Sequence, residues 1–310
     1  MSQTSSLVFE VLLDELFESI NTDSSICPSK NKFILSIVND FEDESWRYSK
    51  FQSFVWDNIK ETALSYEERE KLYDRNQSLL VAAAKSLRLS DKSDIGGGSE
   101  LAEVVLYGIM KHHYHALPVV PKIFYKQNSQ DNAKGADSVH IVINGDDFTL
   151  WLGEAKFYNN IEDSRLDEIV RSVGSLLNTD KLKKENSIIT SVQDLDKYID
   201  DNTIKCRIKK CLNSETSIDV LKPHLHIPIL LLHECNITKK TKIVSNEYRQ
   251  SIIDYHKKRS IAYFKKQVLA LSTTVAQYSD MTFHVILFPV HDKKEIVNMF
   301  LANVKHYKDQ

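Results

Sequence analysis

The stretch that decides the fold is residues 135–158, which read GADSVHIVINGDDFTLWLGEAKFY. Two runs rich in β-branched and aromatic residues flank the sequence Asn-Gly-Asp-Asp at 144–147, which is typical of a β-hairpin turn. Because side chains alternate along a strand, Glu154 and Lys156 project from one face of the returning strand. The turn folds Asp137 back to the same edge, so two carboxylates and one ammonium are expected to converge there.

Outward from this hairpin, the pattern alternates helices and strands and predicts an α/β fold. Helices are expected over 47–63, 65–88, 99–115, 163–177 and 246–275, and strands over 32–38, 119–125, 137–143, 148–158, 226–233 and 282–290. Ser65 and Glu68 form a capping box at the start of the second helix. The strands over 226–233 and 282–290 are almost wholly apolar, which is typical of strands buried on both faces.

Three consecutive glycines end the segment 91–98 and mark the best candidate domain boundary. Residues 1–90 are predicted to form an N-terminal α/β region that is a candidate for partner binding. Residues 91–310 are predicted to form the domain that carries the chemistry, with a basic helical C-terminal part.

The charge of the chain is unevenly spread, because residues 181–310 carry 22 basic and 14 acidic side chains. An excess of positive charge favours contact with the phosphate backbone of DNA. The alternative is that these charges only form the solvent-exposed face of a helix. The residues expected to make that contact lie on the long helix and are Lys257, Lys258, Arg259, Lys265 and Lys266.

Composition limits the class of protein. The 310 residues are 42% hydrophobic and 27% charged, as in a soluble globular protein. The longest apolar stretches, such as 227–232, are far shorter than the roughly 20 residues of a membrane span. The first residues lack the basic segment of a secretory signal, and the four cysteines form no Cys-x-x-Cys pair. A cytoplasmic protein without a membrane partner is expected.

The glycines at 96–98 lack the Gly-Lys-Ser/Thr of a nucleotide loop, so no bound nucleotide is expected.

Two carboxylates and a backbone carbonyl form a suitable site for Mg²⁺, a hard cation that also accepts oxygens from a substrate phosphate. We expect Asp137, Glu154 and the carbonyl of Ala155 to hold Mg²⁺, with Mn²⁺ as a substitute. Lys156 would orient the attacking water or neutralise the transition state. A Glu-x-Lys tripeptide alone also occurs as an ordinary ion pair, so this hypothesis depends on the hairpin around it.

The order of helix, three-stranded meander, helix and strand resembles the restriction-endonuclease-like core of the PD-(D/E)xK nuclease superfamily. Asp137 matches the aspartate of that superfamily, and residues 154–156 match its Glu-x-Lys. The resemblance also implies an acid on the first core helix, where Glu100 and Glu103 are the candidates and Glu103 is slightly favoured. Acids in a first helical turn also serve the helix dipole. Ala136 stands where the superfamily has a proline.

A narrower resemblance rests on three blocks: GSELAEVVLY at 98–107, GADSVH at 135–140 and LWLGEAKFY at 150–158. They are similar to the HamA family, the nuclease subunits of the Hachiman anti-phage defence system. Ser99 and Ala102 stand where that family usually has glycine. The resemblance implies a metal-dependent DNase whose partner, a HamB-type helicase subunit, restrains it until DNA is disturbed.

Two other functions stay open. One is a sequence- or structure-specific endonuclease of the restriction or resolvase type. The other is a non-catalytic regulatory subunit that binds DNA. The complete set of Asp137, Glu154 and Lys156 argues against the second, because silent members of the superfamily usually lose one of the three.

Overall fold

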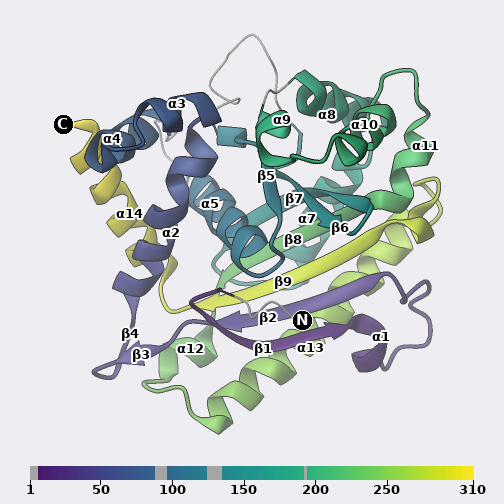
Figure 1. Cartoon of the computed structure of the whole chain (residues 1–310). Helices are drawn as coiled ribbons and strands as arrows, with labels where there is room; N and C mark the ends of the chain where they lie inside the picture. The colour runs from purple at the N-terminus through teal and green to yellow at the C-terminus, as the bar shows by residue number, and fades with distance from the viewer. Residues whose placement is uncertain (1–5, 88–95, 124–134, 192–193) are drawn as a thin grey trace.

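A mixed sheet of seven strands forms the centre of the computed structural model, which describes residues 6–87, 96–123, 135–191 and 194–310 (Figure 1). In sheet order the strands are β1 (Glu10–Leu16), β2 (Lys32–Val38), β9 (Thr282–Val290), β8 (Leu225–Glu234), β7 (Asp147–Tyr158), β6 (Ser138–Asn144) and β5 (Leu117–Val120). The strands β2, β9, β8 and β7 run parallel, and the pairs β1–β2, β7–β6 and β6–β5 are antiparallel. The predicted α/β class is confirmed.

The two apolar strands occupy the middle of the sheet, as their composition predicts. Between Ile227 and His233 of β8, and between Phe283 and Val290 of β9, every side chain is buried. Strands in this position have helices on both faces, so neither face needs polar side chains.

One face of the sheet is covered by helices from both ends of the chain (Figure 1). These are α2 (Tyr48–Ala63), α4 (Asn76–Ser86), α5 (Gly96–His112) and α14 (Lys293–Lys308). Every side chain of α5 from Leu101 to Met110 is buried, because this helix lies between the sheet and α2. Its Leu106 approaches Gly153 of β7, where a Cβ atom would be 2.7 Å from Cδ2 of Leu106.

The opposite face is covered mainly by α7 (Asp163–Leu176) and α13 (Asn246–Leu271). Shorter helices complete this layer or connect the strands: α1 (Phe17–Ile20), α8 (Thr179–Ser191), α9 (Asp194–Tyr198), α10 (Asn202–Cys211), α11 (Ile218–Leu221) and α12 (Asn236–Lys240). A two-stranded ribbon of β3 (Phe41–Glu42) and β4 (Ser45–Trp46) leads into α2. No helix in these described ranges combines the length and the apolar character that crossing a membrane would need.

The first ninety residues contribute to the same sheet as the rest of the chain. Strand β2 pairs in parallel with β9, with Leu35 opposite Ile286. Residues 88–95, where the chain passes from the N-terminal part to α5, lie outside the described residues.

The prediction of one continuous helix over 65–88 is wrong, because the structure has two helices there, α3 (Tyr66–Lys71) and α4. The capping box at the start is confirmed. The hydroxyl of Ser65 accepts a hydrogen bond from the backbone N–H of Glu68 at 3.3 Å, and the Glu68 carboxylate accepts one from the backbone N–H of Ser65 at 3.0 Å.

A turn separates these two helices, and within it the backbone N–H of Arg75 donates to the carbonyl of Leu72 at 2.8 Å. The turn directs α4 so that Leu79 and Ala83 are buried in the core shared with α2 and α14. The apolar spacing continues across the break, so the sequence pattern does not reveal it.

The helix predicted to begin at Ser99 begins at Gly96 instead, so Ser99 lies inside α5 and does not cap it. Its end is also earlier than the predicted residue 115. His115 has a left-handed backbone with φ 52°, and the N–H of Ala116 donates to the carbonyl of Met110 at 3.0 Å. The left-handed residue turns the chain out of the helix, and the N–H of Ala116 satisfies a carbonyl of the last helical turn.

The strand predicted over 119–125 begins earlier, at Leu117, and ends at Val120, and residues 124–125 of that prediction lie outside the described residues. Pro121 follows directly, and it cannot donate a backbone hydrogen bond to a neighbouring strand. Strand β5 lies at the sheet edge, the position in a sheet where a proline such as Pro118 is tolerated. Residues 124–134, between β5 and β6, lie outside the described residues.

Gly108→Val should destabilise the protein, because a Cβ at residue 108 would lie 2.4 Å from Cζ of Phe54 and 2.9 Å from Nδ2 of Asn58. Overpacking of this kind costs about 1–3 kcal/mol. Urea unfolding monitored by circular dichroism measures the change. Ser99→Val, at an exposed position of the same helix, is the control and should change stability by less than about 0.5 kcal/mol. Equal stability of both variants would contradict the close packing of α5 on α2.

Candidate active site

The β6–β7 hairpin places Asp137 beside the end of β7. Ser138 lies opposite Gly153 in the antiparallel pair, and the backbone N–H of Asp137 donates to the carbonyl of Gly153 at 2.8 Å. The carboxylate of Asp137 also reaches β7, where its Oδ2 accepts a hydrogen bond from the backbone N–H of Ala155 at 3.0 Å. Both the backbone and the side chain of Asp137 are therefore fixed to β7.

Glu154 and Lys156 lie on the same face of β7 and contact each other. The Nζ atom of Lys156 is 2.5 Å from Oε1 of Glu154 and 3.9 Å from Oδ2 of Asp137. From α7, the hydroxyl of Ser172 donates to the same Oε1 of Glu154. The structure thus brings together the two acids and the lysine on which the sequence hypothesis depends.

The two carboxylates carry more negative charge than one ammonium neutralises. Glu154 is only 5% exposed, and burial together with the charge of Asp137 raises the pKa of its carboxyl above the ordinary value. Burial alone would lower the pKa of Lys156, but the neighbouring carboxylates of Glu154 and Asp137 outweigh it and the pKa is raised. Lys156 is therefore a cation, and the cluster as a whole remains attractive to a further positive charge.

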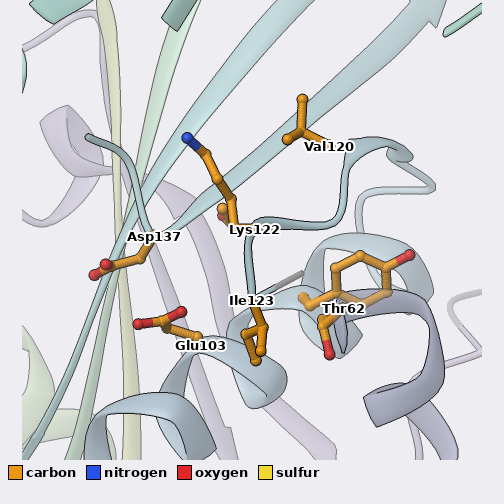
Figure 2. Close-up of a pocket in the computed structure, with 8 residues that line it drawn as sticks. Thr62, Glu103, Val120, Lys122, Ile123 and Asp137 are labelled. Atoms are coloured by element: carbon orange, nitrogen blue, oxygen red, sulfur yellow. The ribbon is translucent and has the colours of Figure 1, made fainter. Parts of the chain in front are cut away.

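Of the two acids expected on the first core helix, Glu103 is the one placed at this cluster. It is 5% exposed and lines a small pocket with Asp137, Lys122 and Thr62 (Figure 2). Figure 2 shows the carboxylates of Glu103 and Asp137 at the same end of that pocket. The charge of Glu103 also raises the pKa of Lys156. Glu100 is half-buried and does not line the pocket.

In the described part of the chain, the side-chain groups around Lys156 that could bind a cation are carboxylates. No histidine or cysteine is among them. Among the described residues, no group of three His, Cys, Asp or Glu side chains is close enough to hold a metal ion. A cation here would depend on two carboxylates completed by backbone and water oxygens. That donor set fits Mg²⁺, which usually keeps several waters, and does not fit zinc.

Sequence reasoning missed two neighbours of this cluster. Ser172 is one, and its only signal is the helical spacing that places it between the buried Ile169 and Leu176 of α7. The other is an ion pair between Lys122 and Glu185, whose side chains are 2% and 1% exposed. No sequence pattern indicates that pair, because its members are 63 residues apart.

Three of the five basic residues of α13 that were expected to contact DNA make ion pairs within the chain. Arg259 lies 2.7 Å from Asp163, Lys265 2.7 Å from Asp23, and Lys266 2.8 Å from Asp167. Two of these pairs connect α13 to α7. A DNA contact by these three residues, or by Lys257 and Lys258 on the same helix, stays a prediction.

Comparison with known proteins places the chain in a family. The family model described as HamA matches residues 11–304 of the 310. The match includes the hairpin, the cluster on β7 and the N-terminal strands alike. A search of curated proteins found no match.

Asp137→Asn should lower the pKa of Glu154 in metal-free protein, because the substitution removes a neighbouring negative charge. Burial, the larger cause of the raised pKa, remains in the variant. Titration of the side-chain carboxyl carbons by ¹³C NMR measures it. Asp146→Asn, at the exposed far end of the same hairpin, should leave it unchanged. An identical pKa in both variants would show that Asp137 and Glu154 do not interact.

Proposed function

The chain belongs to the HamA family, and we propose that it is a metal-dependent DNA nuclease that hydrolyses phosphodiester bonds. Membership associates the chain with Hachiman anti-phage defence. The observation that carries the proposal is the convergence of Asp137, Glu154 and Lys156 at one end of β6 and β7. Two acids that attract a cation, with an ammonium beside them, suit chemistry on a phosphate group.

The proposed catalytic core follows the PD-(D/E)xK plan of the nuclease superfamily. Helix α5, the antiparallel strands β5, β6 and β7, helix α7 and strand β8 occur in that order along the chain, with α8 to α11 between α7 and β8. Helix α5 packs on one face of the sheet and α7 on the other. This order, with the acids on β7 and on α5, supports the assignment.

In the proposed site, Mg²⁺ would be held by the carboxylates of Asp137 and Glu154 and by the backbone carbonyl of Ala155. Mn²⁺ would substitute for it, and Glu103 would assist from α5. When bound, such a cation stabilises negative charge on the phosphate and promotes the ionisation of water. The raised pKa of Glu154, caused by burial and by Asp137, supports a cation in this position because a positive charge would relieve that repulsion.

Lys156 would act as a permanent cation beside the scissile phosphate. Its pKa is raised by Glu154 and Asp137 against the effect of burial, so the side chain stays protonated at neutral pH. Its ammonium would orient the attacking water and stabilise the charge that develops on the phosphate oxygens. The contact with Glu154 holds the ammonium in position for that role.

The proposed partner is a HamB-type helicase subunit that restrains the nuclease until DNA is disturbed. A nuclease that reads only the phosphate backbone has no sequence test that spares the host genome, so the restraint must come from outside the active site. Moving a population from 99:1 active to 1:99 requires a differential affinity of about 5.5 kcal/mol. Residues 1–90 are the proposed contact region for that partner.

Glu154→Gln and Lys156→Met should each reduce plasmid degradation in saturating Mg²⁺ by about 100-fold or more, because the first removes a carboxylate from the proposed cation site and the second removes the ammonium beside the reacting phosphate. Gel assays of the purified protein, alone and with its helicase, measure the loss. The controls are Glu67→Gln and Lys71→Met, which alter an exposed pair on α3 with its N and O atoms 3.9 Å apart. Cleavage at the wild-type rate by folded Glu154→Gln would refute this active site. Discrete fragments would favour a restriction-type enzyme, and DNA binding without cleavage a regulatory subunit.

The helicase should protect the host from this protein. Expression of the wild-type chain alone should fragment host DNA, coexpression with the helicase should leave it intact, and DNA damage should restore fragmentation. Gel analysis of genomic DNA scores each culture, and Glu154→Gln expressed alone gives the background. Equal fragmentation with and without the helicase would contradict restraint by the partner.

A further inference from the structure

A buried ion pair contacts the backbone of the residue immediately before Asp137. Nζ of Lys122 lies 2.6 Å from Oε2 of Glu185, and the two side chains are 2% and 1% exposed. The other carboxylate oxygen, Oε1, accepts a hydrogen bond from the backbone N–H of Ala136 at 3.1 Å. One oxygen of Glu185 is therefore used by the lysine and the other by the residue next to Asp137.

Glu185 approaches this backbone so closely that residue 135 has no room for a side chain. A Cβ atom at Gly135 would lie 1.6 Å from Oε1 of Glu185 and 2.7 Å from its Cδ. The absence of a Cβ in glycine permits this approach. The backbone just before Asp137 therefore packs directly against a carboxylate that belongs to α8.

The ion pair joins three segments beside the candidate site. Lys122 follows β5, Ala136 precedes β6 and Glu185 lies on α8. Lys122 also lines the pocket that holds Asp137 and Glu103, and its side chain extends away from Glu103 (Figure 2). The cost of desolvating two charges offsets most of their attraction, so a buried ion pair adds little to the stability of a protein. Its place next to Asp137 points to a role in geometry.

We propose that Glu185, oriented by Lys122, is a positioning residue for Asp137; this inference rests on the proposed function of that site. Asp137 is held to β7 through Gly153 and Ala155 on one side. The bond from Ala136 to Glu185 holds the chain on the other side. Asp137 thereby keeps the position from which it would share a cation with Glu154. Groups that orient metal ligands in this way typically change metal affinity by about 10–100-fold when they are replaced.

Two variants test this role by different means. Glu185→Gln keeps the size of the side chain but removes its charge and places an amide group beside Lys122. Gly135→Ala leaves the charges intact and pushes the Glu185 carboxylate away from the backbone. Two measurements on the full chain apply to both. Calorimetry with Mn²⁺ alone gives the metal affinity, and amide hydrogen exchange at Ala155 reports its hydrogen bond to Asp137.

The matched control is Lys222→Met, which removes another nearly buried lysine, 5% exposed, from an ion pair with Asp219 at 2.8 Å. Lys222 does not line the pocket with Asp137. This variant measures what breaking a partly buried ion pair away from Asp137 does to stability alone. It should lower the midpoint of thermal unfolding and leave Mn²⁺ affinity and exchange at Ala155 as in the wild type.

Glu185→Gln and Gly135→Ala are each expected to weaken Mn²⁺ binding by about 10–100-fold and to speed exchange at Ala155. Wild-type affinity and wild-type exchange in both folded variants would overturn the proposal. Should Glu185→Gln fail to fold, Gly135→Ala decides, because it keeps both charged side chains of the pair. If the wild type itself binds no Mn²⁺, the metal-dependent function fails, and exchange at Ala155 alone decides the positioning role: faster exchange supports it and unchanged exchange overturns it.

Discussion

The register of one antiparallel strand pair determines where the chemistry of this protein lies. With Ser138 opposite Gly153, Asp137 comes just before β6 and its carboxylate accepts the N–H of Ala155. A slip of one residue would turn Glu154 and Lys156 to the opposite face of β7, where Ala155 and Phe157 pack in the core shared with α5. The short hairpin turn resists such a slip, and so does the cost of moving two charged side chains into that core.

Burial of like charges is the second constraint, and it follows from that register. Glu154 is buried beside Asp137 with one lysine for the two acids, and burial and repulsion together raise its pKa. Such a cluster is costly without compensation. Helices on both faces of the sheet contribute to it, since Ser172 on α7 donates to Glu154 and Glu103 reaches the pocket from α5. The negative charge that remains is what makes the cluster a candidate cation site.

The rest of the sheet holds this corner in place. Strands β8 and β9, buried on both faces, connect β7 to β2 and therefore to the N-terminal part of the chain. The charges of α13 have a structural use here, because Arg259 and Lys266 pair with acids on α7, the helix that carries Ser172. A partner that binds the N-terminal residues would contact the same sheet on which the cluster is built.

Local pattern was sufficient for the hairpin, the buried strands β8 and β9 and the convergence of Asp137, Glu154 and Lys156, because alternation, turn composition and short loops act over a few residues. Packing and backbone hydrogen bonds decided where α3 ends and where α5 begins and ends. They also decided which of Glu100 and Glu103 reaches the pocket. The ion pair of Lys122 and Glu185 could not be predicted from the sequence, since its members are 63 residues apart. Contacts of that kind exist only once the sheet has formed, because folding alone removes both charges from water and brings the β5, β6 and α8 segments to one point.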